Sequence, residues 1–254
     1  DLTFKLLKKG DLHNFLRYSF IQKMFFGHNR IFIYKELIEL KSSSQWKFYK
    51  NLLIEDNVGN PIRYFFYPKS SGNQINHVYH LSILNKFFKL DLKKINYVFE
   101  FGGGYGCMAR IFSKINMKIK YCIFDTKIVN FLQYYYLKQN NLNVGFRRIN
   151  QFILINKFTN LDHKLKKNSL FIANWSLSET PLNYRKKIIK IMKNYQYILI
   201  SFQEYFEDID NKNYFKKLKV KYQNKFKINI ILNQNYKGNI FKKQNHYFFI
   251  AKKL

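Results

Sequence analysis

The sequence has little cysteine and little proline: of its 254 residues, two are cysteine and three are proline. Cys107 and Cys122 lack the paired spacing of a zinc site, and two thiols exclude a disulfide framework, so we expect a protein of the reducing cytoplasm. The chain also lacks an uninterrupted apolar run that is long enough to cross a bilayer, and we expect no membrane span. Asp1–Gly10 contains no apolar stretch followed by small residues and does not predict a secretory signal.

Acidic residues are scarce as well: 45 lysines and arginines face 15 aspartates and glutamates, giving a formal net charge of +30. This charge would attract a polyanion, and a basic face would also help to bind nucleotide-sugars or anionic glycans. However, the frequent residues Lys, Asn, Ile, Phe and Tyr have A/T-rich codons, so genome base composition explains the same excess. The lysines are spread along the whole chain, which favours the second explanation. We therefore expect no sequence-specific recognition of nucleic acid.

The first part of the chain, residues 1–92, predicts a mostly helical N-terminal cap that would form the substrate region. Apolar residues recur at helical spacing from Leu12 to Met24, with Gly27 as a helix stop, and again over His77–Leu90. Between these segments, Asp56–Gly72 holds two of the three prolines and is predicted to be loop.

The remainder, residues 93–254, alternates between strand and helix patterns, which is typical of a parallel sheet covered by helices on both faces. We expect seven strands, at Tyr97–Phe101, Lys120–Phe124, Asn143–Ile149, Ser169–Ala173, Tyr197–Phe202, Lys227–Leu232 and His246–Ala251. We expect helices between them, at Met108–Ile115, Lys127–Gln139, Leu182–Lys193 and Asn211–Leu218. Because only Asn233–Asn245 separates the last two strands, they should form an antiparallel hairpin. The expected fold is α/β and Rossmann-like, with five parallel strands closed by that hairpin.

The strongest local signal is the segment Val98–Gly106, in which an apolar strand runs into a glycine-rich loop and then a helix. Glycine permits positive φ and lets the backbone approach a ligand closely, and the following helix N-terminus favours an anionic group. Glu100 can receive the α-amino group of a bound methionine moiety, directly or through water. The spacing differs from the dinucleotide fingerprint G-x-G-x-x-G, because the third glycine comes one position early. The candidate cofactor-binding residues of this segment are Glu100, Gly102, Gly103, Gly104 and Gly106.

Asp125 ends the next predicted strand, in the run Tyr121–Asp125. Ligands of open α/β sheets bind at the carboxyl edge of the strands, where an acid about 20 residues beyond the glycine loop bonds ribose hydroxyls. The alternative is that Asp125 only caps the helix that begins near Lys127. Asn150 and Gln151, which follow the third predicted strand, are candidates for contact with the edge of an adenine ring.

A polar segment, Asn174–Pro181, follows the fourth predicted strand. It would lie where a transferable group meets its acceptor, and Asn174 is a candidate cofactor-binding residue. The alternative is that a side chain of this segment caps the helix beginning at Leu182, with Pro181 near the first turn. The candidates for capping are Ser178, Glu179 and Thr180.

The glycine loop, Asp125 and Asn174–Pro181 resemble class I S-adenosylmethionine-dependent methyltransferases over about Asn96–Leu254. More narrowly, the glycine loop, Asn174–Pro181 and Asn60–Leu84 resemble the sugar O-methyltransferase family of bacterial surface-glycan clusters. This resemblance implies S-adenosylmethionine as cofactor and S-adenosylhomocysteine as product. It also implies a sugar, nucleotide-sugar or glycan as acceptor, and it leaves a divalent metal open.

A sugar hydroxyl is a poor nucleophile, so a base or a metal should assist its deprotonation. The candidates are His77, His80 and Glu179. At spacing i, i+3 the two histidines can share one helical face, and the unperturbed histidine pKa of about 6.5 suits proton acceptance at neutral pH. A carboxylate would need a raised pKa or a metal, so we favour histidine, and His77 over His80. The alternative is that each histidine is an ordinary surface or core residue.

Two other functions remain open. A nucleic-acid methyltransferase is the nearest enzymatic alternative. The Asn/Asp-Pro-Pro-aromatic sequence expected of amino-methylating DNA enzymes is replaced here by Asn174–Leu177. A cytosine-C5 methyltransferase would need a Pro-Cys nucleophile, and neither cysteine follows a proline. The other alternative is a non-catalytic binding module that keeps the fold. The intact glycines and Asp125 argue against such a loss of the cofactor site.

Overall fold

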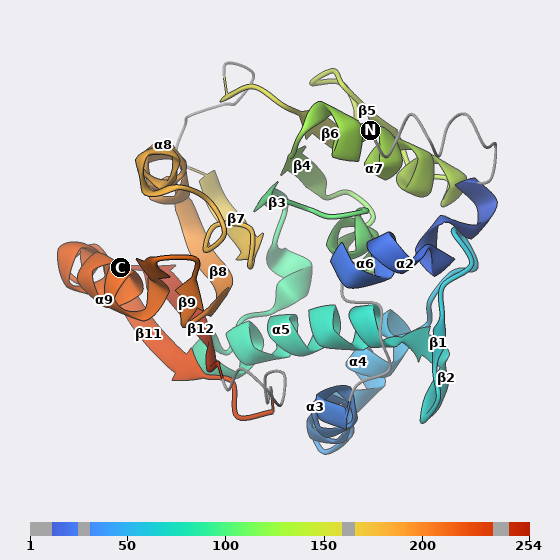
Figure 1. Ribbon diagram of the computed structural model, residues 1–254, viewed down its shortest axis with the longest axis horizontal. Helices are drawn as coiled ribbons and strands as arrows, with labels where there is room; N and C mark the ends of the chain where they lie inside the picture. The colour runs from blue at the N-terminus through green and yellow to red at the C-terminus, as the bar shows by residue number, and fades with distance from the viewer. Residues whose placement is uncertain (1–11, 25–30, 159–165, 236–243) are drawn as a thin grey trace.

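The computed structural model describes residues 12–24, 31–158, 166–235 and 244–254. Eight strands form its main sheet: β3 (Tyr97–Phe101), β4 (Lys120–Phe124), β5 (Val144–Gly145), β6 (Phe152–Ile155), β7 (Lys166–Asn174), β8 (Tyr195–Gln203), β11 (Phe226–Leu232) and β12 (His246–Lys253). Their order is β11-β12-β8-β7-β3-β4-β6-β5 (Figure 1). The pairs from β8 to β5 are parallel, whereas β12 runs antiparallel to both β8 and β11. This confirms the expected α/β fold, with parallel strands closed by an antiparallel hairpin.

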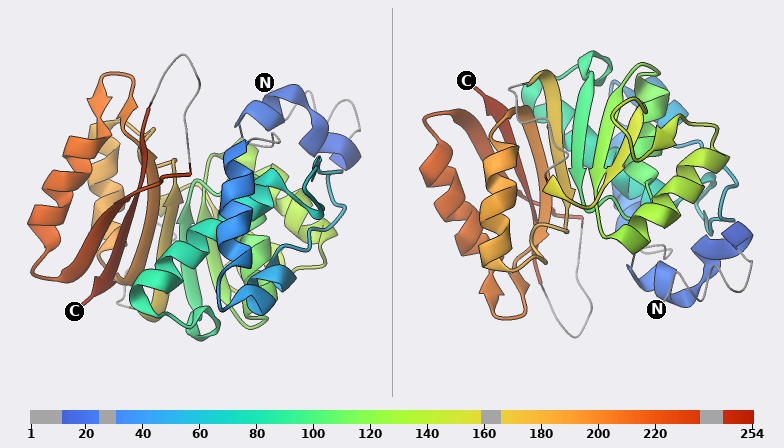
Figure 2. Two further views of the ribbon diagram at one scale, coloured as in Figure 1. Left: turned by 90° about the horizontal axis from the view of Figure 1, so that it is seen from below. Right: turned by 90° about the horizontal axis from the view of Figure 1, so that it is seen from above.

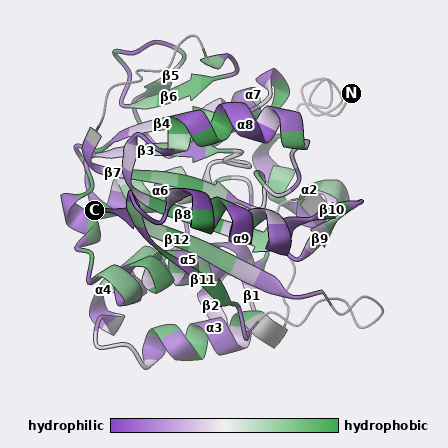
Figure 3. Cartoon of the chain, turned by 90° about the vertical axis from the view of Figure 1, so that its left-hand side faces the viewer, coloured by the Kyte–Doolittle hydropathy of each residue, from purple (hydrophilic) through white to green (hydrophobic). Residues whose placement is uncertain are grey.

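Helices cover both faces of this sheet (Figure 2). One face carries α8 (Leu182–Met192) and α9 (Asn211–Tyr222), and the other carries α5 (Gly72–Phe88), α6 (Cys107–Ile115) and α7 (Lys127–Gln139). Figure 3 shows α8 and α9 from outside, with hydrophilic positions on their ribbons in purple. The four helices predicted after residue 93 are confirmed, and each packs buried apolar residues against the sheet.

The N-terminal region contains η1 (Leu12–Arg17), α2 (Ser19–Met24), α3 (Ile31–Lys41), α4 (Trp46–Leu52) and η2 (Leu92–Lys94), besides α5. Its apolar core continues into that of the sheet, so residues on both sides of position 92 share one buried cluster. Gly27, the predicted helix stop, lies outside the described residues. None of the helices in the described part of the chain combines the length and the apolar character needed to cross a bilayer.

Two short hairpins were not expected from the sequence. The predicted loop Asp56–Gly72 contains β1 (Arg63–Tyr64) paired antiparallel with β2 (Tyr67–Ser71). A second two-stranded unit, β9 (Tyr205–Phe206) and β10 (Ile209–Asp210), follows β8. Pro68 does not prevent the first hairpin, because an edge strand tolerates a missing backbone donor.

The predicted strand Asn143–Ile149 is wrong. Only Val144–Gly145 has strand geometry, and the neighbour of β4 is β6, with Tyr121 opposite Phe152. All four residues of β6 are buried, whereas Ile149 is 80% exposed. A short apolar run with both faces covered carries no alternation, so the strand pattern was assigned one segment too early.

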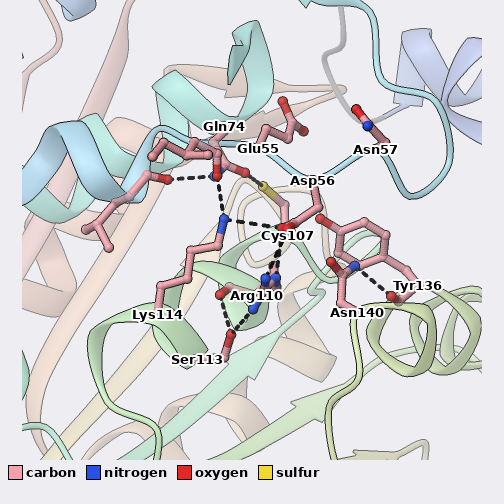
Figure 4. A network of polar contacts seen from close by, with 12 residues as sticks. Glu55, Asp56, Asn57, Gln74, Cys107, Arg110, Ser113, Lys114, Tyr136 and Asn140 are labelled. Carbon is pink, nitrogen blue, oxygen red and sulfur yellow. Dashed lines mark hydrogen bonds and ion pairs between the residues drawn. The ribbon is translucent and has the colours of Figure 1, made fainter. Parts of the chain in front are cut away.

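A charged cluster joins the N-terminal region to the helix behind the glycine loop (Figure 4). Asp56 accepts two hydrogen bonds from Arg110 of α6, at 2.9 Å from Nε and 3.0 Å from Nη2, and lies 3.2 Å from Lys114 Nζ. Burial raises the pKa of Asp56, but the two cations lower it by more, so the pKa lies below its ordinary value. The bidentate geometry fixes the orientation of the cap against α6.

The corrected strand generates a stability prediction. Phe152→Ala should lower the free energy of unfolding by about 3–5 kcal/mol, because it leaves a cavity in a fully buried site. Ile149→Ala should change it by no more than about 0.5 kcal/mol, because that side chain is exposed. Urea denaturation of both variants measures the difference. Equal losses would contradict the placement of β6.

Candidate functional site

The carboxyl ends of β3, β4 and β7 meet around a cavity of about 460 Å³. Of the residues proposed from the sequence, the cavity brings together eight, namely His77, Glu100, Gly102, Gly103, Gly104, Asp125, Asn174 and Glu179. Gly106, His80 and Asn150 do not line it. The volume falls within the range of small-molecule sites.

The glycine loop forms the floor of the cavity between β3 and α6. Gly102 has φ +73°, and a Cβ atom there would lie 2.3 Å from the Cβ atom of Ser176. A Cβ atom on Gly103 would lie 2.6 Å from Ile123 and 2.9 Å from a carboxylate oxygen of Glu100. These positions require glycine because side chains would displace the neighbouring strand end and loop. Gly106 is the N-cap of α6, at φ +102°.

Glu100 lies beneath this loop and is 2% exposed. The hydroxyl of Tyr121 donates a hydrogen bond to its Oε2 atom at 2.8 Å. Burial, together with a smaller contribution from the negative charge of Asp125, raises the pKa of Glu100 from 4.5 to about 8. A cationic group entering the cavity would stabilise the carboxylate form of Glu100.

Asp125 follows β4 at the edge of the same cavity. Its carboxylate accepts hydrogen bonds from the backbone N–H of Thr126 (2.8 Å) and from Nε2 of Gln133 (3.1 Å), besides backbone groups of the glycine loop. Burial raises the pKa of Asp125 to about 6. The N-cap of α7 is Thr126, whose hydroxyl accepts from Val129 N at 3.4 Å, so Asp125 does not have the capping role considered above.

The segment Asn174–Pro181 is fixed in shape by contacts to its backbone. The N-cap of α8 is Pro181 without a side-chain cap, so none of the three polar residues before it caps the helix. Instead, the hydroxyl oxygen of Ser178 lies 2.6 Å from Trp175 O and 2.7 Å from Gln203 Oε1, so its single hydrogen is shared between these two acceptors. Trp175 has φ +59°, an uncommon conformation for a bulky residue.

Arg185 of α8 holds this segment from below and is fully buried. Its guanidinium donates to the carbonyl oxygens of Ser178 and Thr180, each at 2.6 Å, and to Asn211 Oδ1 at 2.8 Å. Burial lowers the pKa of Arg185 from its ordinary value. The charge is compensated by carbonyl dipoles, which makes the guanidinium a rigid support for the backbone.

The two candidate histidines have different positions. His77 lines the cavity, and its Nδ1–H donates to the carbonyl oxygen of Asn73 at 2.8 Å, which leaves the lone pair on Nε2. His80 is 1% exposed, packs between the rings of Trp175 and Phe248, and contacts Asn174 Oδ1 through Nδ1 at 3.1 Å. Their ring centroids are 6.3 Å apart, as expected for one helical face.

Burial weakens the argument that favoured histidine as the base, which rested on the unperturbed histidine pKa. It lowers the pKa of His77 from 6.5 to about 4 and that of His80 to about 3. Both imidazoles are therefore neutral at neutral pH, and each is a weaker base than the sequence argument assumed. Burial raises the pKa of Glu179, which lines the cavity and accepts a hydrogen bond from Gln203 Nε2 at 3.3 Å. The difference in basicity between His77 and Glu179 is thus smaller than expected.

Asn150 lies away from the cavity, in the connection that precedes β6. Its side chain bonds Asn143 Oδ1 at 3.0 Å and the backbone N–H of Arg147 at 3.3 Å. Gln151 donates to Met117 O at 2.6 Å. Asn150 was placed at the cavity because Asn143–Ile149 was predicted to be the strand beside β4. The strand that pairs with β4 is β6, and its carboxyl end is Ile155.

The structure adds residues that the sequence argument missed. The end of β8 and the start of β12 reach the cavity through Gln203 and His246, which are opposite each other in the antiparallel register. Nε1 of Trp175 donates to His246 Nδ1 at 3.2 Å. His246 could have been predicted from the sequence, because it is the first residue of the last predicted strand. A strand that runs antiparallel to the others begins at the edge of the sheet where they end. In the part of the chain that the structure describes, no group of three or more His, Cys, Asp or Glu side chains is arranged to hold a metal ion.

Comparisons with known proteins identify the fold. No family model matches the chain, and no curated protein matches it in sequence. The methyltransferase domain of the bacterial protein CtHen1 is similar in structure at 11% identity, covering 71% of this chain and 98% of that one, with a TM-score of 0.50. A protein from Clostridium thermocellum assigned as an rRNA methylase is similar at 16% identity, covering 69% and 96%, also with a TM-score of 0.50. The chain has the Rossmann-like fold of class I methyltransferases.

The buried carboxyl of Glu100 generates a prediction for stability against pH. With a pKa of about 8 in the folded protein against 4.5 unfolded, its contribution is present below pH 4.5 and is lost as pH rises toward 8. Glu36, fully buried and with a pKa of about 8, acts in the same direction. Between about pH 7.5 and 8.5, above the unfolded pKa of the histidines and above the pKa of about 7 of the buried Glu55, the free energy of unfolding should fall by up to about 1 kcal/mol per pH unit for each of these two groups.

Glu100→Gln keeps a hydrogen-bonding partner for Tyr121 and removes the titration, so it should reduce this slope by about half. The exposed Glu207→Gln serves as the control and should keep the wild-type slope. Urea denaturation across the window measures both. A slope unchanged by Glu100→Gln would show that Glu100 is ionised in the folded protein.

Proposed function

We propose that the protein is an S-adenosylmethionine-dependent methyltransferase that methylates a hydroxyl of a sugar or glycan precursor. The observation that carries this proposal is the convergence of the glycine loop, Asp125 and the segment Asn174–Pro181 on one cavity. Ligand sites of open α/β sheets lie at this edge.

The residues on the floor of the cavity fit this cofactor. The glycine backbone permits close approach, Glu100 would hold the α-amino group, and Asp125 would accept hydrogen bonds from the ribose hydroxyls. Asn174 lines the adjoining wall. The cofactor supplies a methyl group on a sulfonium, and the chain's own contribution is to bind it and to align the acceptor.

The opposite wall supports an acceptor that is rich in hydroxyl groups. It consists of polar side chains on several elements, including His77, Glu179, Gln203 and His246. Such a set offers both donors and acceptors of hydrogen bonds. In this proposal His77 accepts the proton from the hydroxyl through Nε2, and Glu179 is the alternative base. His80, buried behind the wall, orients Asn174.

The cofactor assignment is tested by Asp125→Ala. The loss of hydrogen bonds to a carboxylate, each worth roughly 1.5–3 kcal/mol, should weaken binding of S-adenosylhomocysteine by about tenfold or more. Asn150→Ala, outside the cavity, should leave affinity unchanged. Isothermal titration calorimetry gives both affinities. The assignment fails if wild-type protein does not bind, or if Asp125→Ala binds as tightly as wild type.

The base is tested by His77→Ala, His80→Ala and Glu179→Gln in an assay with radiolabelled S-adenosylmethionine and a panel of sugars and nucleotide-sugars. His77→Ala should lower turnover by about 10²–10⁴-fold with cofactor affinity nearly intact. Glu179→Gln should have the smaller effect, unless Glu179 is the base. His80→Ala should also perturb the thermal melting temperature, because the ring is buried. Turnover preserved in all three variants would exclude this site.

An RNA methyltransferase is the second candidate function. The similarity to the assigned rRNA methylase supports it, as do α8 and α9, which carry eight lysines outside the core in 23 positions and no acidic residue. Methyl transfer to structured RNA in the same assay, with no transfer to sugars, would favour this candidate. Binding of S-adenosylhomocysteine without transfer to either class would favour a non-catalytic module.

A further inference from the structure

The connection between β1 and β2 exposes two adjacent phenylalanine rings. Phe65 is 78% exposed and Phe66 is 59% exposed, and no aromatic side chain in the described part of the chain is more exposed than these. Both form the two-residue turn of the hairpin, at the right-hand edge of the molecule in Figure 1. Adjacent exposed rings at a convex turn are costly in water and indicate contact with an apolar phase.

The neighbouring helix α3 extends this apolar surface. The ring of Phe66 lies 5.1 Å from that of Tyr34 and 5.2 Å from that of Phe65. Tyr34 and Ile38 of α3 are 43% and 41% exposed. We call the four side chains Phe65, Phe66, Tyr34 and Ile38 the hairpin patch.

Exposed lysines lie on both elements that carry the hairpin patch. Lys35 and Lys41 on α3 and Lys69 on β2 are exposed, and the whole chain carries a net charge of +30. The exposed acidic residue of α3, Glu39, is hydrogen-bonded to Tyr79 and Asn235. A partner of this surface should therefore combine an apolar phase with negative charge.

We propose that the hairpin patch inserts into the interface of an anionic lipid bilayer and docks the protein there as a peripheral membrane protein. Two exposed rings offer on the order of 300 Å², well below the roughly 800 Å² per partner of a stable protein interface. A bilayer needs no complementary shape: rings enter the boundary between headgroups and acyl chains while lysines contact anionic headgroups. This inference is independent of the methyl-transfer reaction.

The test is cosedimentation of the full chain with vesicles of phosphatidylcholine alone or mixed in equal parts with phosphatidylglycerol. Wild type should bind the anionic vesicles more tightly, and high salt should weaken binding. The double variant Phe65→Ser, Phe66→Ser should lower the partition coefficient by about tenfold or more for each ring. The matched control is Phe131→Ser, Phe146→Ser, which removes two other exposed rings in mutual contact and should bind like wild type.

Insertion is measured separately with Phe65→Trp, whose added fluorescence should shift to the blue with anionic vesicles and be quenched by brominated lipid. Phe65→Ser alone, at the more exposed position, replaces the double variant if the latter does not fold. Absent wild-type binding, equal binding by the double variant, or a tryptophan that is not quenched would overturn the proposal. Concentration-dependent dimerisation that the double variant abolishes would also overturn it, in favour of a second copy of the chain.

Discussion

The parallel pairing of β3 with β4 and β7 is the constraint on which the site depends. Parallel strands in register end at one edge of the sheet, so the pairing of these strands brings residues that are far apart in sequence together at that edge. Glu100, Asp125 and Asn174 are each at or one position from such a strand end. The glycine loop then supplies open space at this edge, because Gly102, Gly103 and Gly104 turn the chain there without side chains.

Within the part of the chain that the structure describes, Glu100 and His77 of the cavity are held by neutral hydrogen bonds and burial, without an ion pair. Glu100 is bonded to a tyrosine hydroxyl, and His77 to a backbone carbonyl. Burial therefore moves each group toward its uncharged form, raising the pKa of the acid and lowering that of the imidazole. An incoming cationic group would therefore stabilise the carboxylate form of Glu100, which lies near the negative charge of Asp125.

Much of the fold follows from the sequence, since β3, β4 and α7 have the predicted bounds. These elements have strong alternation between apolar runs and breakers, so local pattern and tertiary packing agree. The third strand was misplaced because Phe152–Ile155 is too short and too uniformly apolar to show a period, and Asn150 was consequently placed at the wrong edge. The basicity of His77 and His80 was also misjudged, because burial is set by packing between distant segments.

Arg185 has a consequence for how this site can change over evolution. Its hydrogen bonds to the segment beneath the cavity go to the carbonyl oxygens of Ser178 and Thr180, and not to their side chains. These two bonds fix the main chain on either side of Glu179 without using the Glu179 side chain. Glu179, between the two anchored carbonyls, can be exchanged for other residues while the loop keeps its shape. The side chain presented to the cavity at this position can then change by a single substitution, without a compensating change in the scaffold.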